Sequence, residues 1–204
     1  MANPAYAPPA SNYKLPANLG RVGTVARFKP VHKAHAAMLE SLCERAEHVI
    51  IGLGSCNRYN LRNPFTPQES AEMIDRVLKP RYTNYTFIEV PDFDNGPLWR
   101  EHALKLFGAL DYFVTANDYV EQLLKNDYPL IHPLALIPAA KRVPINATMV
   151  RRAMAHGESW EHLVPEPVIE YIKTNNLDAR FVHEFGLATI AQYADELIAA
   201  GARP

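Results

Sequence analysis

Residues 21–42 read RVGTVARFKPVHKAHAAMLESL, and they place a strand directly before a helix. The apolar run over 21–26 predicts a β-strand, and the sequence over 33–46 predicts a helix. His32 and His35 are three residues apart, so on a helix they share one face. A helix N-terminus attracts anions through its free backbone N–H groups and its dipole. The stretch therefore indicates a phosphate-binding turn and nucleotide chemistry.

Composition excludes several classes of protein. The chain has 204 residues, which predicts one domain with or without an extension, and its 48% hydrophobic content is enough for a core. A net charge of −1 gives no global basic field for nucleic acid or a membrane surface. Cys43 and Cys56 are too few for a disulfide framework, and the first 20 residues show no secretory pattern. We therefore expect a cytoplasmic protein without a nucleic-acid or membrane partner.

The sequence divides into three parts. Prolines at 4, 8, 9 and 16 predict a loose or extended arm over 1–20. We expect an α/β domain over 21–145. From 146 to 204 the pattern is helical, and we expect this part to belong to the same domain.

Strand and helix patterns alternate along 21–145. Strands are predicted over 48–53, 84–90, 111–115 and 129–137, and helices over 67–79, 98–107 and 118–126. Thr66-Pro67-Gln68-Glu69 has the form of a capping box. This alternation predicts a doubly wound, Rossmann-like parallel sheet of about five strands with C-terminal helices. Ligands of such sheets bind beyond the carboxyl ends of the strands.

Helices are also predicted in the C-terminal part. Asn146 or Thr148 caps one that ends near Gly157. Another helix begins after Pro165, and the last covers roughly 187–199.

Four stretches carry the chemistry: ARFKPVHKAH over 26–35, IGLGS over 51–55 leading through Arg62 to NPFT over 63–66, Asp92 with Trp99, and INATMVR over 145–151. In order and spacing they resemble the nucleotidyltransferase superfamily with the HxGH motif. More narrowly, they resemble the nicotinamide-mononucleotide adenylyltransferases of the archaeal type. The resemblance covers roughly residues 21–185.

The sequence departs from the family pattern at four positions. Ala34 stands where the family has a glycine between the histidines. That glycine lets the backbone and the ligand approach each other closely. Asn146 replaces a serine, Ala26 a glycine and Lys29 a glutamine. We expect these changes to affect rate and substrate preference more than fold.

The resemblance implies that the 5′-phosphate of nicotinamide mononucleotide attacks the α-phosphorus of ATP, giving NAD and pyrophosphate. Such a reaction needs two aligned anions and stabilisation of the leaving pyrophosphate, without a covalent enzyme intermediate. Mg²⁺ is implied with ATP and is held largely by the phosphates, so no protein metal ligand is expected. The resemblance also implies a homo-oligomer.

The resemblance assigns roles to individual residues. Catalysis falls to His32, His35 and Arg151. These three also bind ATP, together with Ala26, Arg27, Phe28, Asn117 and Thr148. Nicotinamide mononucleotide is held by Ser55, Arg62, Asn63, Asp92 and Trp99, with the tryptophan stacked on the pyridinium ring.

Simpler interpretations stand beside these roles. The histidine pair could be exposed, or could hold zinc, although no third ligand stands at a suggestive spacing. Arg58 could substitute for Arg62, Asn117 could be a helix cap, and Trp99 could pack in the core. The other histidines, His132 among them, carry no motif and are expected to be structural or exposed.

Two further functions compete with the first. The same chemistry could act on another phosphate-bearing acceptor, such as phosphopantetheine, flavin mononucleotide, or a phospho-alcohol with CTP. Alternatively, Ala34 and Asn146 could mark a nucleotide-binding protein with impaired catalysis.

Overall fold

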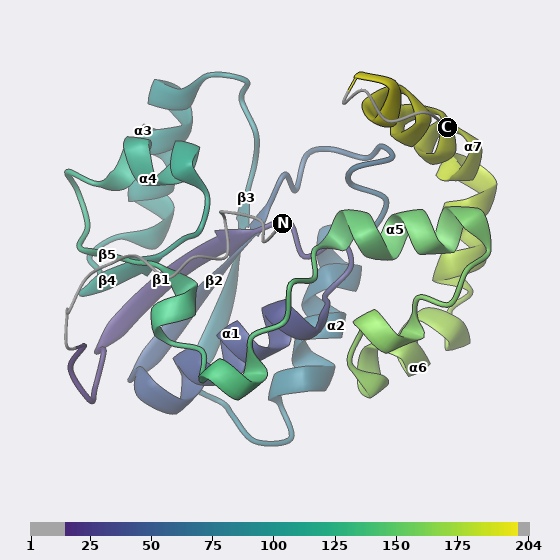
Figure 1. Cartoon of the computed structure of the whole chain (residues 1–204). Helices are drawn as coiled ribbons and strands as arrows, with labels where there is room; N and C mark the ends of the chain where they lie inside the picture. The colour runs from purple at the N-terminus through teal and green to yellow at the C-terminus, as the bar shows by residue number, and fades with distance from the viewer. Residues whose placement is uncertain (1–14, 200–204) are drawn as a thin grey trace.

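Five parallel strands form the centre of the protein, whose computed structural model describes residues 15–199 (Figure 1). Residues 1–14 of the expected arm and 200–204 lie outside the described residues. The strands are β1 Arg21–Ala26, β2 His48–Gly54, β3 Tyr85–Val90, β4 Tyr112–Val114 and β5 Leu130–Ile131. The helices are α1 Lys33–Arg45, α2 Pro67–Leu78, α3 Gly96–Phe107, α4 Asp118–Leu124, α5 Ala147–His156, α6 Glu166–Thr174 and α7 Leu177–Ala199.

The sheet has the strand order β3-β2-β1-β4-β5, and every pair is parallel. The chain starts at the centre with β1, adds β2 and β3 on one side, and then crosses to β4 and β5 on the other. This is the predicted doubly wound Rossmann-like fold. The point where the direction of winding reverses lies between β1 and β4, which is where such sheets bind ligands.

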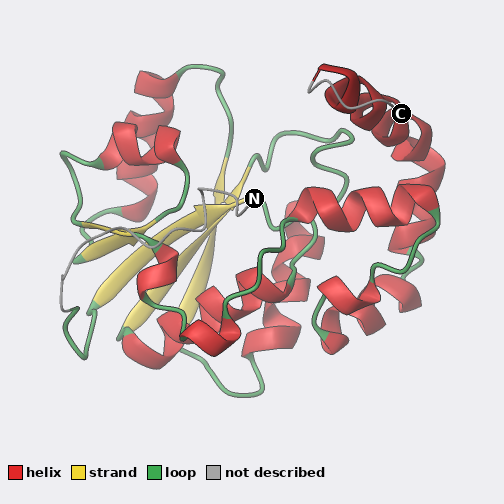
Figure 2. Ribbon diagram, in the orientation of Figure 1, coloured by secondary structure: helices red, strands yellow, loops and turns green. Residues whose placement is uncertain are grey.

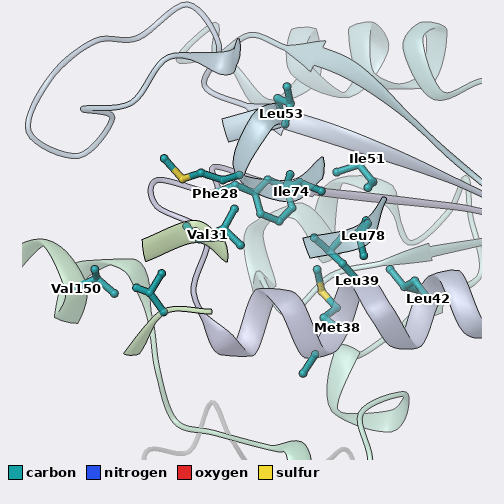
Figure 3. Packing of buried hydrophobic residues seen from close by; sticks show 14 of the residues in the cluster. Phe28, Val31, Met38, Leu39, Leu42, Ile51, Leu53, Ile74, Leu78 and Val150 are labelled. Atoms are coloured by element: carbon teal, nitrogen blue, oxygen red, sulfur yellow. The ribbon is translucent and has the colours of Figure 1, made fainter. Parts of the chain in front are cut away.

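Helices cover both faces of the sheet (Figure 2). On one face, Met38, Leu39 and Leu42 of α1 pack with Ile51 of β2 and Ile74 of α2 (Figure 3). On the other face, Phe107 of α3 and Leu124 of α4 pack with Ile50, Val90 and Phe113 of the strands. Because all five strands between these two layers are parallel, their carboxyl ends lie at the same edge of the sheet.

Helices α5, α6 and α7 extend the first layer beside α2 (Figure 1). Asn146 caps α5 by accepting a hydrogen bond from the Met149 N–H at 3.0 Å, and Gly157 ends it in the left-handed conformation. Both ends of this helix match the prediction. Val150 is fully buried and belongs to the same core cluster as Leu39 of α1 and Ile51 of β2, so α5 is part of the same domain.

Two elements differ from the prediction. The strand expected over 129–137 is only Leu130–Ile131, because Pro129 and Pro133 supply no ladder N–H and His132 caps a 3₁₀ turn instead. Helix α7 begins at Leu177, ten residues before the expected start at 187. Gly186 weakens its intrinsic helical signal, and packing against α5 stabilises the helix.

The last residues of the expected arm are held against the domain. Leu19 is 1% exposed, and its N–H donates to the Arg45 carbonyl at 2.8 Å. The Arg45 side chain in turn donates to the Pro16 carbonyl at 2.8 Å. Across residues 15–199, no helix combines the length and the apolar character that crossing a membrane requires.

Candidate active site

A cavity of about 740 Å³ opens at the carboxyl edge of the sheet, across the reversal between β1 and β4. Segments that follow all five strands line it, together with the start of α5. Figure 1 shows the first turn of α5 close to the arrowheads of β1 and β2. The predicted residues that line this cavity are Ala26, Arg27, Phe28, His32, His35, Ser55, Asp92, Trp99, Asn117, Thr148 and Arg151.

Two predicted residues lie elsewhere. Arg62 lines a neighbouring cavity of about 250 Å³, which shares Arg27, Thr148 and Arg151 with the larger one. Asn63 is 5% exposed and donates its amide to the Asn60 Oδ1 at 3.1 Å, outside the lining of either cavity. The Asn63 Oδ1 is buried without a hydrogen-bond partner among the described residues. Roles for Arg62 and Asn63 in binding the mononucleotide stay predictions.

The backbone is strained where two strands meet the cavity. Phe28, after β1, and Ser55, after β2, both have a φ of 54°, the left-handed region that non-glycine residues rarely adopt. Such conformations cost of the order of 1–3 kcal/mol each and cluster at functional sites. Both residues line the cavity, so the strain lies where ligand contacts are expected.

The two histidines stack on one another at the start of α1. Their ring centroids are 3.7 Å apart, and the His35 N–H approaches the His32 Nδ1 at 3.4 Å. Because Nδ1 of His32 accepts this contact, its Nε2 carries the proton in the neutral ring. The Nδ1 of His35 is buried and has no protein partner within the described chain. The pair thus offers ring nitrogens to a ligand.

Both rings are neutral in the free protein. Burial, with a smaller contribution from the nearby Arg151 guanidinium, lowers the pKa of His32 to about 3. Burial, and then the His32 ring, hold the pKa of His35 well below its usual value. At neutral pH the pair therefore meets a phosphate as N–H donors and not as cations.

A prediction for stability follows from the His32 pKa. Between about pH 6.5 and pH 3 the His32 ring is protonated in the unfolded chain but not in the folded protein. The free energy of unfolding therefore decreases as pH falls through this window. His32→Asn should make the pH dependence of the free energy of unfolding shallower there, by up to about 1.4 kcal/mol per pH unit. Urea unfolding between pH 4 and 7 measures it. The exposed His183→Asn serves as control, and equal slopes in both variants would contradict the prediction.

Two guanidinium groups, those of Arg27 and Arg151, contribute positive charge to the cavity. Arg151 is 6% exposed, donates from Nη1 to the Lys29 carbonyl at 2.7 Å, and donates from Nη2 to the Thr148 Oγ1 at 3.3 Å. Burial, followed by repulsion from Arg27 and Arg62, lowers the pKa of Arg151 to about 10, so it remains charged at neutral pH. Guanidinium groups that repel one another around a cavity are suited to a polyanion.

A second polar cluster lies after β2 and β3. The Ser55 hydroxyl donates to the Asp92 Oδ2 at 2.6 Å. The Asn57 side chain exchanges two hydrogen bonds of 2.8 Å with the Asp92 backbone. Trp99, on α3, is half-buried and lines the cavity with them. This end of the site therefore offers an aromatic face, a carboxylate and a hydroxyl.

A third group of residues lines the cavity near the ends of β4 and β5. Asn117 caps α4, because its Oδ1 accepts from the N–H groups of Tyr119 and Val120 at 3.0 and 3.2 Å. His132 has the expected structural role, since its Nδ1 accepts from the Leu134 N–H at 3.2 Å, but it also lines the cavity. Its position directly after β5 is the signal that could have found it, since ligands lie beyond strand ends.

The described residues offer no protein cage for a metal ion. Nowhere in residues 15–199 do three or more His, Cys, Asp or Glu side chains gather closely enough to bind one. The cavity is instead lined by donors to anions: two imidazoles, Arg27 and Arg151. Donors of this kind are suited to phosphate groups.

Comparison with known proteins gives consistent similarities. Residues 24–153 match the family model described as cytidylyltransferase-like. The chain is 36% identical to the nicotinamide-nucleotide adenylyltransferase of Thermococcus sibiricus over 154 residues, covering 73% of this chain and 81% of the relative. It is 37% identical to the enzyme of the same name from Pyrococcus horikoshii over 152 residues, covering 73% and 80%.

A solved structure is similar in fold. The bifunctional NMN adenylyltransferase/ADP ribose pyrophosphatase of Francisella tularensis superposes with a TM-score of 0.64 at 18% identity. The match covers 91% of this chain and 58% of the Francisella chain. At this identity the likeness concerns the fold, and it supports the Rossmann-like assignment made from the strand order.

Proposed function

The chain belongs to the cytidylyltransferase-like family, alongside archaeal nicotinamide-nucleotide adenylyltransferases, and we propose that it transfers the adenylyl group of ATP to nicotinamide mononucleotide. The products are NAD and pyrophosphate. One observation carries the proposal at the level of the site. The histidine pair, the buried Arg151 and the Ser55–Asp92–Trp99 cluster line a single cavity, although 119 positions separate His32 from Arg151 in the sequence.

The reaction needs no covalent intermediate on the protein. An oxygen of the acceptor's 5′-phosphate attacks the α-phosphorus of ATP, and the bond from that phosphorus to the β-phosphate oxygen breaks. Negative charge builds up on the leaving pyrophosphate. Fixed donors that point at this charge lower the barrier, because they require no rearrangement as the bond breaks.

The residues of the cavity divide this task. Arg151 is held by two protein hydrogen bonds and directs its remaining donors to the triphosphate. Arg27 adds a second charge, and the neutral His32 and His35 donate N–H groups. Mg²⁺ enters as part of the ATP substrate and supplies charge neutralisation on the phosphates. We assign the adenosine to the segments after β4 and β5, where Asn117 and His132 lie.

The acceptor occupies the other end. Trp99 offers an aromatic face to the cationic pyridinium ring, and Asp92 offers a carboxylate to its substituent. The Ser55 hydroxyl holds Asp92 in place at 2.6 Å. The two phosphate-bearing substrates then meet at the arginines and the histidine pair.

The direct test mixes the protein with Mg·ATP and each of several acceptors, and measures pyrophosphate together with the dinucleotide product. We expect nicotinamide mononucleotide to give NAD and stoichiometric pyrophosphate. Turnover only with phosphopantetheine, flavin mononucleotide or a phospho-alcohol would show that nicotinamide mononucleotide is not the acceptor. Ala34, which replaces the family glycine, lines the cavity and is the reason to consider impaired catalysis. Tight binding of both nucleotides without formation of any dinucleotide would identify such a nucleotide-binding protein.

The role of Trp99 gives a prediction about Michaelis constants. Trp99→Ala should raise KM for the mononucleotide about tenfold, because stacking on a cationic ring contributes about 1–2 kcal/mol. KM for ATP should change little. Leu98→Ala, which removes an exposed neighbour on the same helix, is the matched control. Equal increases in both Michaelis constants would show that Trp99 acts through packing.

A further inference from the structure

The smaller cavity continues from the phosphate end of the larger one. It has a volume of about 250 Å³ and shares Arg27, Thr148 and Arg151 with its neighbour. Ligand pockets commonly measure about 300–1,000 Å³, so this one suits part of a nucleotide and not a whole one. The part of ATP that extends beyond the α-phosphate consists of two terminal phosphates. The position of the small cavity matches theirs in the proposed reaction.

One wall of the small cavity comes from the second half of α7, which packs against α5 (Figure 1). The residues of α7 in the lining are Thr189, Gln192, Tyr193 and Glu196. Their spacing of three, one and three residues places them on one face of the helix. None of them belongs to the stretches that predicted the chemistry.

The Thr189 hydroxyl has no partner in the described part of the protein. The residue is 7% exposed, and its buried Oγ1 makes no hydrogen bond to any of residues 15–199. A helical threonine can satisfy its hydroxyl at the carbonyl one turn earlier, but this contact is absent here. A buried hydroxyl without a hydrogen bond is unfavourable, and a ligand that accepts one from it removes this penalty.

Positive charge dominates the lining of the small cavity. The guanidinium groups in it are those of Arg27, Arg62, Arg151 and Arg152. The Tyr193 ring holds one of them, because its centroid lies 3.0 Å from the guanidinium carbon of Arg152. The single carboxylate of the lining, on the exposed Glu196, accepts from the Gln192 amide at 2.6 Å. An anion with several oxygens fits this set of donors.

We propose that Thr189 donates its hydroxyl to the terminal phosphates of ATP, and that Tyr193 positions Arg152 for the same anion. The inference rests on the proposed function and adds α7 to the residues that recognise the donor nucleotide. Arg151 lines both cavities and so connects the reacting α-phosphate with the leaving pyrophosphate. Thr189 lies outside the lining of the larger cavity, so the mononucleotide and the adenylate are not expected to contact it.

Thr189→Val replaces the hydroxyl with a methyl group of similar size. With the mononucleotide at saturation, kcat/KM for ATP should fall about tenfold or more, as expected for a lost hydrogen bond to a charged group. KM for the mononucleotide should change little. The free variant should unfold at no lower temperature than the native protein, because the removed hydroxyl has no partner there.

Two further variants separate recognition from packing at Thr189. Thr189→Ser keeps the hydroxyl and loses the methyl group, so it should retain more kcat/KM for ATP than Thr189→Val. A packing role predicts the reverse order and would contradict the inference. Thr174→Val, at the exposed end of α6, is the matched control and should behave like the native protein.

Calorimetry with inorganic pyrophosphate and with AMP locates the effect on the nucleotide. AMP lacks the two terminal phosphates, so Thr189→Val and Tyr193→Leu should weaken binding of pyrophosphate and leave binding of AMP near the native value. Tyr193→Phe keeps the aromatic face against Arg152 and should lose less affinity for pyrophosphate than Tyr193→Leu.

Two results would overturn the inference while NAD is still formed. One is native affinity for pyrophosphate in Thr189→Val, and the other is an equal loss of affinity for AMP and pyrophosphate. Absence of NAD from ATP and nicotinamide mononucleotide in the native protein would instead overturn the proposed function. The pyrophosphate measurements would then still decide whether Thr189 and Tyr193 contribute to binding this anion.

Discussion

His35→Ala is expected to lower kcat by about 100-fold or more, the usual cost of losing a donor to developing charge. His35 lies under the phosphate end of the cavity, stacked on His32 at 3.7 Å and in contact with Phe28 at 4.8 Å between ring centroids. Its buried Nδ1 has no protein partner within the described chain. We therefore expect substrate to provide the interaction that this ring makes in the transition state.

Two variants separate chemistry from packing at this position. His35→Gln keeps a donor and should retain more activity than His35→Ala, while both lose the ring contacts with Phe28. The exposed His183→Ala on α7 should turn over like the native protein. Steady-state kinetics and thermal unfolding, measured on the same preparations, report the two effects. Native kcat in His35→Ala would remove this residue from the site.

Arg151→Lys should reduce kcat/KM for ATP about 100-fold, even though the positive charge is retained. The guanidinium bonds the Lys29 carbonyl at 2.7 Å and the Thr148 Oγ1 at 3.3 Å, and it still has donors for a phosphate. A lysine ammonium cannot donate to the Lys29 carbonyl, the Thr148 hydroxyl and a phosphate at the same time, because it is a point charge without the planar fork of a guanidinium. Each lost charge-assisted hydrogen bond costs about 1.5–3 kcal/mol.

Arg76→Lys is the control for this substitution. Arg76 lies on α2 and bonds to Glu72 at 3.0 Å, outside both cavities, so its replacement should leave kcat/KM for ATP near the native value. The comparison is made with the acceptor at saturation, so that ATP binding and chemistry are reported. A loss below threefold in Arg151→Lys would show that charge alone is sufficient.

Local signals in the sequence predicted much of the fold. At Thr66 the predicted capping box forms in full: Oγ1 accepts from the Glu69 N–H at 3.1 Å, and the Glu69 carboxylate accepts from the Thr66 N–H at 2.8 Å. Such motifs are decided within one helical turn. Asn146 and Gly157 likewise end α5 as expected. The spacing of strands and helices then predicted the parallel sheet, and with it the edge where the cavity lies.

The features that sequence reasoning missed depend on contacts between distant segments. Lys29 was noted only as a replacement, because the proximity of its Nζ to the Ser55 carbonyl follows from the pairing of β1 with β2. His132 reaches the cavity through the pairing of β4 with β5. Asn63 belongs to a recognisable motif, but its amide bonds Asn60 within the loop. A motif identifies a segment, and packing decides which of its side chains face the ligand.

A crystal structure of the protein with NAD tests most directly the claim that one cavity binds both substrates. We expect the adenylate phosphate within hydrogen-bond distance of His32, His35 or Arg151, and the pyridine ring on Trp99 beside Asp92. A dinucleotide whose phosphates lie away from the Arg151 guanidinium, or whose pyridine ring lies outside the cavity at the ends of β1 and β4, would contradict this claim.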